Sequence, residues 1–239
     1  MGTSKSYEAP TSPAWRRAKL RFGRFAAQGG NAGGGVAGVV DAYVRAHGGA
    51  TAAASSAVAA KATLRRLGSF FGDVARLGFE GALRENGLGN LMGLGTEAVL
   101  LGIADLVCPD GATHDQADAR HAAVEVLNKM LDDAATEDEL ALLFESNANS
   151  AGVRDLFEQF VVQFVYGKML RVLGEGLESG PVDAGTKRLR SKEILDYVAS
   201  RVNLEMALFS DVAVLDFGGE RGRELVDRVF QDAYEVCVL

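Results

Sequence analysis

The 239-residue chain contains few of the residues from which metal centres and disulfide frameworks are built. Its two cysteines, Cys108 and Cys237, exclude a disulfide scaffold and a cysteine-rich zinc module, and they fit a reducing cytosol. Only three histidines are present, and aromatic residues make up 8% of the chain, whereas 48% is hydrophobic and 29 residues are glycine. We therefore expect a globular protein with a core of leucine, valine and alanine. Composition alone indicates no function.

Long hydrophobic runs are also missing. The uncharged stretch 25–40 is rich in glycine, and the apolar stretch 88–108 is interrupted by Glu97 and Asp105, whereas a membrane-spanning helix requires about 18 or more apolar residues. Residues 1–15 are polar and lack the apolar segment of a signal peptide. The sequence therefore predicts a cytoplasmic protein without a membrane anchor.

The net charge of −7 conceals two halves of opposite sign. Residues 1–87 carry 12 lysines and arginines against 5 acidic residues, and residues 88–239 carry 13 against 27. An acidic body repels phosphate backbones, so we expect no direct binding of nucleic acid. The basic half alone could meet nucleic acid, an anionic membrane surface or the acidic half of another copy, but the pattern favours a solvated arm that keeps the protein soluble.

Three segments are distinguished by composition. Residues 1–13 are rich in serine, threonine and proline and predict a flexible tail, because they offer little apolar surface to bury. Ser12 and Pro13 are a helix cap and a first-turn proline, and they begin a basic amphipathic helix over 13–28. Six glycines in 29–38 predict a flexible linker. The predicted divisions are a tail (1–13), a basic helix with its linker (14–38) and a helical domain (39–239).

The helical domain shows apolar residues at helical spacing in nearly every segment. Two capping boxes begin helices here, Thr113 with Gln116 and Thr136 with Glu139. The pattern predicts helices over 39–46, 52–84 with a break near Gly68, 96–107, 113–133, 136–145, 152–173, 188–208 and 219–236. The fold class is therefore predicted to be all-α, a helical bundle with a flexible N-terminal tail and a glycine-rich linker.

Four segments of this domain carry a more specific expectation. The helix over 96–107 is apolar on nearly all sides and is expected to be buried. The helix over 152–173 has the strongest apolar face and is expected to form the centre of the core. A loop is expected over 174–185, and only 212–217 hints at a strand.

Two patterns with possible chemistry are weak. The glycine-rich stretch 93–98 approaches the dinucleotide-binding fingerprint, but no strand precedes it, so helix-breaking glycines are the better interpretation. His114, Asp118 and His121 fall on one helix face and could hold a metal ion. No further ligand pattern accompanies them, and the sequence favours a solvated first turn stabilised by the helix dipole.

Other reactive groups have structural interpretations. Cys108 is expected to be a buried, inert thiol. The acidic runs 132–133 and 137–139 are typical of helix caps and solvated surface rather than of an acid–base pair. We therefore predict neither a catalytic constellation nor a cofactor or metal.

The predicted basic helix is more informative. Its apolar residues are Trp15, Leu20, Phe22 and Phe25, and its cations are Arg16, Arg17, Lys19, Arg21 and Arg24. Such a helix can lie on an anionic membrane or dock in a groove of a partner. Five cations with so few apolar residues predict a modest membrane affinity, so docking on a protein, the acidic body included, is at least as well supported.

The N-terminal sequence MGTSKSY offers a reactive amine. Methionine before glycine is ordinarily removed, because the aminopeptidase accepts a small second residue, and the α-amine of Gly2 is then exposed. An α-amine has a pKa of about 8 and so keeps a larger neutral fraction at physiological pH than a lysine does. The same string fits the myristoylation pattern, which we set aside because the Ala-, Gly- and Arg-rich composition is bacterial in character. An ordinary polar terminus is the alternative.

Three stretches and the glycine-rich linker together resemble one family. These stretches are MGTSKSY, the block LRRLGSFFGDVARLGFEGALRENGLGNLMGLGTEAVLLGIADLVCPDGATHDQADARHA, and VLDFGGERGRELVDRVF near the C-terminus. They resemble the QatB proteins of the bacterial Qat anti-phage defence system. The resemblance covers most of the chain, and its most specific parts are the MGTS start and residues 83–121.

This resemblance implies partners and a role. The family is encoded beside an ATPase (QatA), an enzyme resembling 7-cyano-7-deazaguanine synthase (QatC) and a TatD-like nuclease (QatD). It implies a non-catalytic protein that is the partner and substrate of the QatC-like enzyme, which attaches a 7-deazaguanine to Gly2. The residues implied in recognition are Thr3, Ser4, Lys5, Ser6 and Tyr7, with the linker letting the tail reach an active site. The alternative is a structural adaptor or effector that binds the ATPase or a membrane surface through the basic helix.

Overall fold

The computed structural model describes residues 11–109, 111, 113–132, 134–174, 182–206 and 216–238. Every regular element in these ranges is helical, which confirms the predicted all-α class. The α-helices are α1 (Pro13–Gln28), α2 (Gly35–Ala46), α3 (Ala50–Ser55), α4 (Val58–Glu85), α5 (Thr96–Val107), α6 (His114–Asp132), α7 (Glu137–Asn147), α8 (Ser150–Leu173), α10 (Ala184–Met206) and α11 (Glu220–Glu235). Two short 3₁₀ helices, η1 (Ala32–Gly34) and η2 (Gly89–Leu91), lie in glycine-rich connections. No described helix is both long and apolar enough to cross a membrane.

The helix starts follow local rules. The hydroxyl of Ser12 accepts a hydrogen bond from the backbone N–H of Trp15, so α1 begins where the sequence predicts. Both predicted capping boxes form, at the starts of α6 and α7. Helix α8 begins at Ser150, two residues earlier than predicted, because the side chain of Asn149 caps it.

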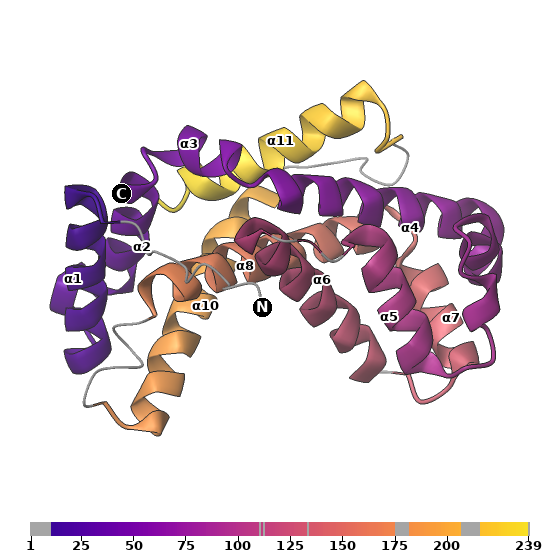
Figure 1. Ribbon diagram of the computed structural model, residues 1–239, viewed down its shortest axis with the longest axis horizontal. Coiled ribbons are helices and arrows are strands. Elements are labelled where there is room, and N and C mark those ends of the chain that lie inside the picture. The colour runs from indigo at the N-terminus through magenta and orange to yellow at the C-terminus, as the bar shows by residue number, and fades with distance from the viewer. Residues whose placement is uncertain are drawn as a thin grey trace, which may run out of the picture.

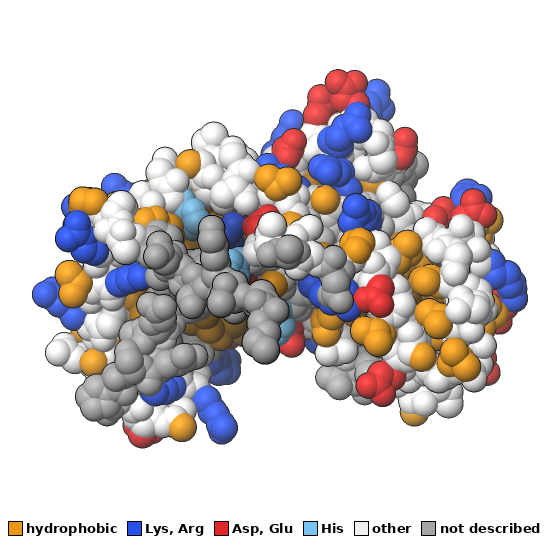
Figure 2. Space-filling view, in the orientation of Figure 1, with side chains coloured by type: hydrophobic (Ala, Val, Ile, Leu, Met, Phe, Trp, Pro, Cys, Tyr) orange, Lys and Arg blue, Asp and Glu red, His pale blue; other side chains and the backbone are white. Residues whose placement is uncertain are grey.

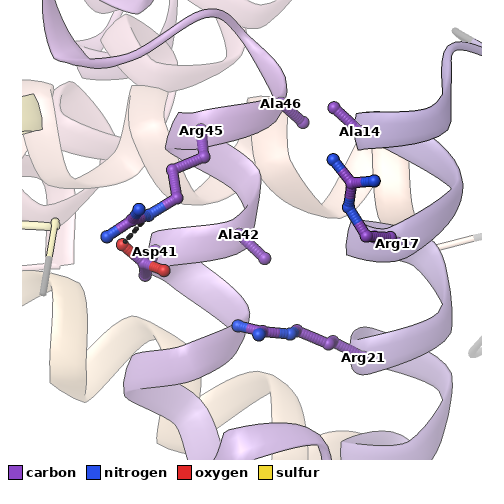
Figure 3. Close-up of a pocket in the computed structure, with 7 residues that line it drawn as sticks. All are labelled: Ala14, Arg17, Arg21, Asp41, Ala42, Arg45 and Ala46. Atoms are coloured by element: carbon purple, nitrogen blue, oxygen red, sulfur yellow. Dashed lines mark hydrogen bonds and ion pairs between the residues drawn. The ribbon is translucent and has the colours of Figure 1, made fainter.

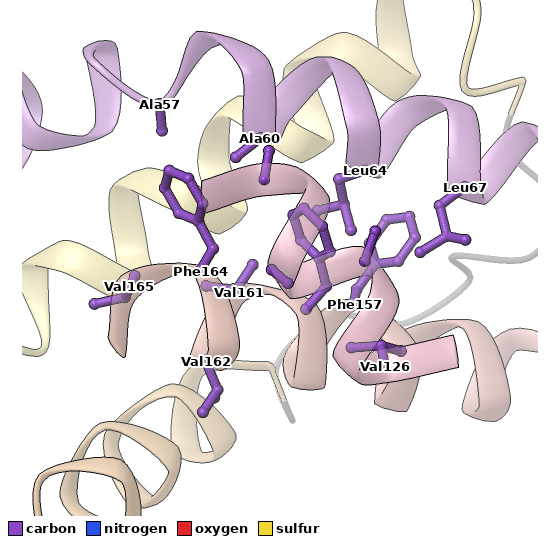
Figure 4. Packing of buried hydrophobic residues seen from close by; sticks show 14 of the residues in the cluster. Ala57, Ala60, Leu64, Leu67, Val126, Phe157, Val161, Val162, Phe164 and Val165 are labelled. Atoms are coloured by element: carbon purple, nitrogen blue, oxygen red, sulfur yellow. The ribbon is translucent and has the colours of Figure 1, made fainter. Parts of the chain in front are cut away.

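Helix α8 runs through the centre of the fold (Figure 1), where it packs against α6 and α10. Phe157, Val161 and Phe164 are fully buried and point toward Ala60 and Leu64 of α4 (Figure 4). Burying one phenylalanine side chain stabilises a fold by about 1.5–3 kcal/mol. The prediction that this helix forms the centre of the core is confirmed.

Helix α4 is interrupted ten residues later than the sequence predicts. Gly68 lies within the regular helix, and the residue with non-helical geometry is Gly78, with a φ of 72°. Glycine adopts this left-handed conformation without steric cost. The N–H of Phe79 donates to the Glu145 carboxylate of α7 at 2.9 Å, which satisfies a backbone donor beside the interruption.

Helix α5 is less buried than predicted. Its contacts with α4, α6 and η2 cover one side, so the opposite side faces solvent and Leu101 exposes 54% of its surface. Most of the predicted strand, residues 212–215, and residues 175–181 of the predicted loop lie outside the described residues. Phe217, at the end of the predicted strand, is buried against Phe157 with ring centroids 5.2 Å apart.

The glycine-rich connection after α1 is a packed turn. A Cβ on Gly33 would overlap the carbonyl oxygen of Arg21, and a Cβ on Gly29 would overlap the guanidinium of Arg190. Both glycines have positive φ. Helix α2 begins at Gly35, four residues earlier than predicted. The connection therefore holds α1 and α2 together as an αα-hairpin, which we call the N-terminal hairpin, and is not the free hinge that its composition predicts.

Gly68 and Gly72 provide a matched pair of substitutions on α4. A Cβ on Gly68 would lie 2.7 Å from the Phe217 ring and 2.9 Å from the Phe157 ring, whereas one on Gly72 meets nothing within 4 Å. We expect Gly68→Ala to lower the free energy of unfolding by about 1–3 kcal/mol through overpacking. We expect Gly72→Ala to raise it by up to about 1 kcal/mol through helix propensity. Urea unfolding measures both, and two changes of the same sign would contradict the packing at Gly68.

Candidate functional site in the N-terminal hairpin

The sequence points to two N-terminal features, and the structure describes one of them. Outside the described residues lie the predicted modification and recognition residues, Gly2, Thr3, Ser4, Lys5, Ser6 and Tyr7. The predicted basic helix is α1, with the predicted bounds. The described part of the candidate site is therefore built on α1 and on α2, against which it packs.

Helix α1 separates apolar from basic side chains. Its buried residues are Trp15, Ala18, Phe22, Phe25 and Ala26. The sequence groups Leu20 with the apolar residues of this helix, but Leu20 is not buried with them. It exposes 63% of its surface, because it lies on the side of the helix turned away from α2. The helix contains no acidic residue, and Lys and Arg side chains stand along the edge that it forms (Figure 2).

The hairpin differs sharply in charge from the rest of the protein. Residues 13–47 carry six lysines and arginines and one acidic residue, whereas residues 48–239 carry 18 and 30. The excess positive charge of the protein is therefore concentrated on two helices at one end of the molecule (Figure 1). Such a concentration attracts anionic ligands to that end.

An arginine-rimmed depression of about 460 Å³, which we call the arginine cleft, lies between α1 and α2 (Figure 3). Its lining residues are Ala14, Arg17, Arg21, Asp41, Ala42, Arg45 and Ala46. The Nε of Arg45 donates to Asp41 at 2.7 Å, and Nη1 of Arg21 donates to the carbonyl of Gly38 at 3.3 Å. Two of the three guanidinium groups are thus held in place by contacts within the hairpin.

The other predicted cations lie on a different side of α1. Arg16, Lys19 and Arg24 border a shallow groove of about 600 Å³. Its apolar surface comes from Leu20, Gly23 and Ala27. The structure therefore brings Arg17 and Arg21 together and separates them from Arg16 and Arg24, whereas the sequence treats all the cations of this helix as one site.

An aromatic cluster, which we call the junction, lies where the hairpin meets the body. The rings of Trp15, Tyr43 and His47 meet edge to face, with centroids 4.8–5.9 Å apart. On the α10 side, the guanidinium of Arg190 lies 5.6 Å from the centre of the Phe25 ring. The ring contacts hold α1 against the end of α2, and the contact of Arg190 with Phe25 joins the hairpin to α10.

Two ion pairs between α6 and α8 lie close to this junction. Lys168 Nζ is 3.1 Å from an Asp115 carboxylate oxygen, and Arg171 contacts Asp118 through Nε and Nη2 at 2.8 and 2.5 Å. The second oxygen of Asp115 accepts the N–H of Ala59 at the start of α4 at 2.8 Å. Local sequence patterns do not indicate either pair, because the partners are 53 residues apart along the chain.

The helix face on which a metal site was considered takes part in one of these ion pairs. Asp118 is engaged by Arg171, and His114 and His121 are exposed. Across the described ranges, no three His, Cys, Asp or Glu side chains come together in a group that could hold a metal ion. The sequence predicts a solvated first turn of α6, but Asp115 in that turn and Asp118 in the next one point toward α8.

The glycine-rich stretch 93–98 is hydrogen-bonded to the acidic run 137–139. The N–H groups of Gly93 and Gly95 donate to the two carboxylate oxygens of Glu137 at 2.8 and 2.6 Å. Glu139 completes the capping box of α7. The interpretation as a helix cap is confirmed for Glu139, whereas Glu137 binds the glycine-rich stretch instead. The backbone N–H groups of Gly93 and Gly95, which a phosphate would need, are already used by a side chain. Cys108 is buried as predicted.

Burial perturbs the titratable groups at the junction. Burial, reinforced by the nearby charges of Lys168 and Arg171, lowers the pKa of His47 to about 4. Burial also raises the pKa of Tyr43 and of Tyr234 well above the ordinary value of tyrosine. At neutral pH the junction is therefore built from uncharged rings beside two paired cations.

His47 should make the stability of the protein depend on pH. Its folded pKa lies below its unfolded value, so its contribution is fully present above about pH 6.5 and is lost as the pH falls toward 4. We expect this residue to account for about 2 kcal/mol of the stability lost between pH 7 and pH 5. His47→Phe keeps an aromatic ring at the junction and removes the titration. Urea unfolding of both proteins at the two pH values checks this, and an identical loss in His47→Phe would contradict it.

Comparison with known proteins assigns the body of the chain to a family. Residues 48–237 match the family model described as Qat anti-phage system associated protein QatB. No curated protein and no solved structure matches the chain. The match begins immediately after His47, so the N-terminal hairpin lies outside it. Because the match covers most of the sequence, this chain belongs to the QatB family and is a component of the Qat anti-phage system.

Proposed function

We propose that this protein is the substrate of the QatC-like enzyme of its defence system, which attaches a 7-deazaguanine to Gly2. Membership of the QatB family supports a role beside such an enzyme. The observation that carries the proposal is the start Met1-Gly2-Thr3-Ser4, since removal of Met1 leaves an unhindered primary α-amine. In this role the chain is not itself an enzyme.

The proposed reaction is an acyl transfer. An enzyme of the 7-cyano-7-deazaguanine synthase type activates the carboxylate of a 7-deazaguanine as an acyl adenylate. The nitrogen of Gly2 attacks the carbonyl carbon, the bond to AMP breaks, and the nitrogen releases a proton as the amide forms. The α-amine suits this step at neutral pH, because its pKa of about 8 leaves more of the neutral, nucleophilic form than a lysine has.

The packed turn of the hairpin changes how the tail would reach the enzyme. Ser12 caps α1, and the connection after α1 is held by close contacts with Arg21 and Arg190. The reach must therefore come from residues 2–11 alone, which span at most about 33–36 Å when fully extended. This proposal requires the enzyme to approach the N-terminal end of α1, next to the arginine cleft.

Intact-mass and N-terminal peptide mass spectrometry test the modification. The chain is expressed with and without the QatC-like enzyme, and we expect an enzyme-dependent mass increase on the peptide that begins at Gly2. Gly2→Pro should abolish the increase, because a ring nitrogen replaces the primary amine. Gly2→Ala keeps a primary α-amine, is the matched control and should keep the increase. An adduct that persists in Gly2→Pro would contradict the assignment to Gly2.

A second candidate role is supported by the hairpin itself. The five cations of α1 are accompanied by no acidic residue in that helix, which suits an adaptor that docks on the defence ATPase or on an anionic surface. In that role the tail is unmodified. An N-terminal glycine that stays unchanged in the presence of the QatC-like enzyme would favour the adaptor over the substrate.

A further inference from the structure

The arginine cleft holds positive charge that the fold does not neutralise. Arg17 and Arg21 are one turn apart on α1, and no ion pair among the described residues involves either of them. Two like charges at this spacing destabilise a helix by about 0.2–0.5 kcal/mol. A cost of this kind, kept without an internal partner, is typical of a binding site.

The cleft is also organised in advance. The Arg21 guanidinium is tethered to the carbonyl of Gly38, and Arg45 is tethered to Asp41, whose side chain is nearly buried. Gly38 itself fits closely, because a Cβ there would lie 3.2 Å from the carbonyl oxygen of Gly33. Groups that are already ordered lose less conformational freedom when a ligand binds.

We propose that the arginine cleft binds the phosphate group of a small molecule. Figure 3 shows Arg21 reaching from α1 toward α2 and Arg17 on the same helix beside Ala14, with Ala42 and Ala46 facing them from α2. The forked guanidinium donors of arginine match the oxygens of a phosphate, and the cleft contains arginine and no lysine. The carboxylate of Asp41 neutralises the charge of Arg45. The two positive charges of Arg17 and Arg21 therefore match the two negative charges of a phosphate dianion.

The lining of the cleft disfavours larger anions. Its floor consists of alanine methyl groups, so an acidic helix would find no pocket for large anchoring side chains. A nucleic acid long enough to pass the hairpin would meet the acidic body. The exposed Leu20, which a membrane would bury, lies in the other groove of α1. The volume of about 460 Å³ falls in the usual range of small-molecule sites.

Titration of the full chain at constant ionic strength tests the site. The probes are inorganic phosphate, AMP and adenosine, and binding is followed by NMR through the arginine Nε–Hε resonances. We expect saturable binding of phosphate and of AMP, and no binding of adenosine. Tighter binding of AMP than of phosphate would identify a nucleotide as the source of the phosphate group, and equal affinity would identify the phosphate alone.

Two double variants separate a specific site from general positive charge. Arg17→Ala with Arg21→Ala should lower the affinity for phosphate and AMP at least tenfold. Arg16→Ala with Arg24→Ala removes the same charge from the other side of the same helix and should change it less than threefold. Replacing Arg17 and Arg21 by lysine keeps the charge and should still cost affinity, because the forked donors are lost. An equal loss in both alanine pairs, or no saturable binding by the native chain, would overturn the proposal, which does not depend on modification of Gly2.

Discussion

Helix α8 carries two cations, the nearly buried Lys168 and the partly buried Arg171, and the need to pair them shapes the surrounding fold. Both lie three residues apart on α8, and their partners, Asp115 and Asp118, lie three residues apart on α6. The two pairs therefore fix the register of these helices against each other. In each pair one partner is nearly buried, so loss of the other partner would leave a buried charge without its counter-ion and is expected to be destabilising.

The same cluster links the body to its other helices. Asp115 also accepts a backbone hydrogen bond from the start of α4, so one carboxylate positions α4, α6 and α8 together. Burial, together with the nearby charges of Lys168 and Arg171, lowers the pKa of His47, the residue at which the hairpin ends. The cations of α8 thus form ion pairs within the body, whereas the cations of α1 line surface grooves.

Local patterns were sufficient to predict most of the helices. Ser12 and the two capping boxes mark helix starts correctly, because a cap is formed by residues three apart in the sequence. Apolar spacing identified α8 as the central helix for the same reason. Composition failed at the glycine-rich connection, since glycine permits close packing as well as flexibility, and only the neighbouring Arg21 and Arg190 decide between them. It also failed at α5, whose outer face is apolar yet exposed.

The candidate site was predicted only in part. The cations of α1 were visible, but their separation into two grooves depends on where α2 lies, which no local pattern states. Asp41 and Arg45 could have been found from their i, i+4 spacing. The ion pairs of α8 could not, because each joins positions 53 residues apart.

We propose that the function of this protein lies at its N-terminal end and that its body serves as a scaffold. Hydrogen exchange of the full chain, alone and with the QatC-like enzyme, tests that assignment most directly. We expect the enzyme to slow amide exchange in the hairpin, residues 13–47, and to leave the exchange of α6 and α8 unchanged. Protection confined to residues 48–237, with an unchanged hairpin, would contradict it.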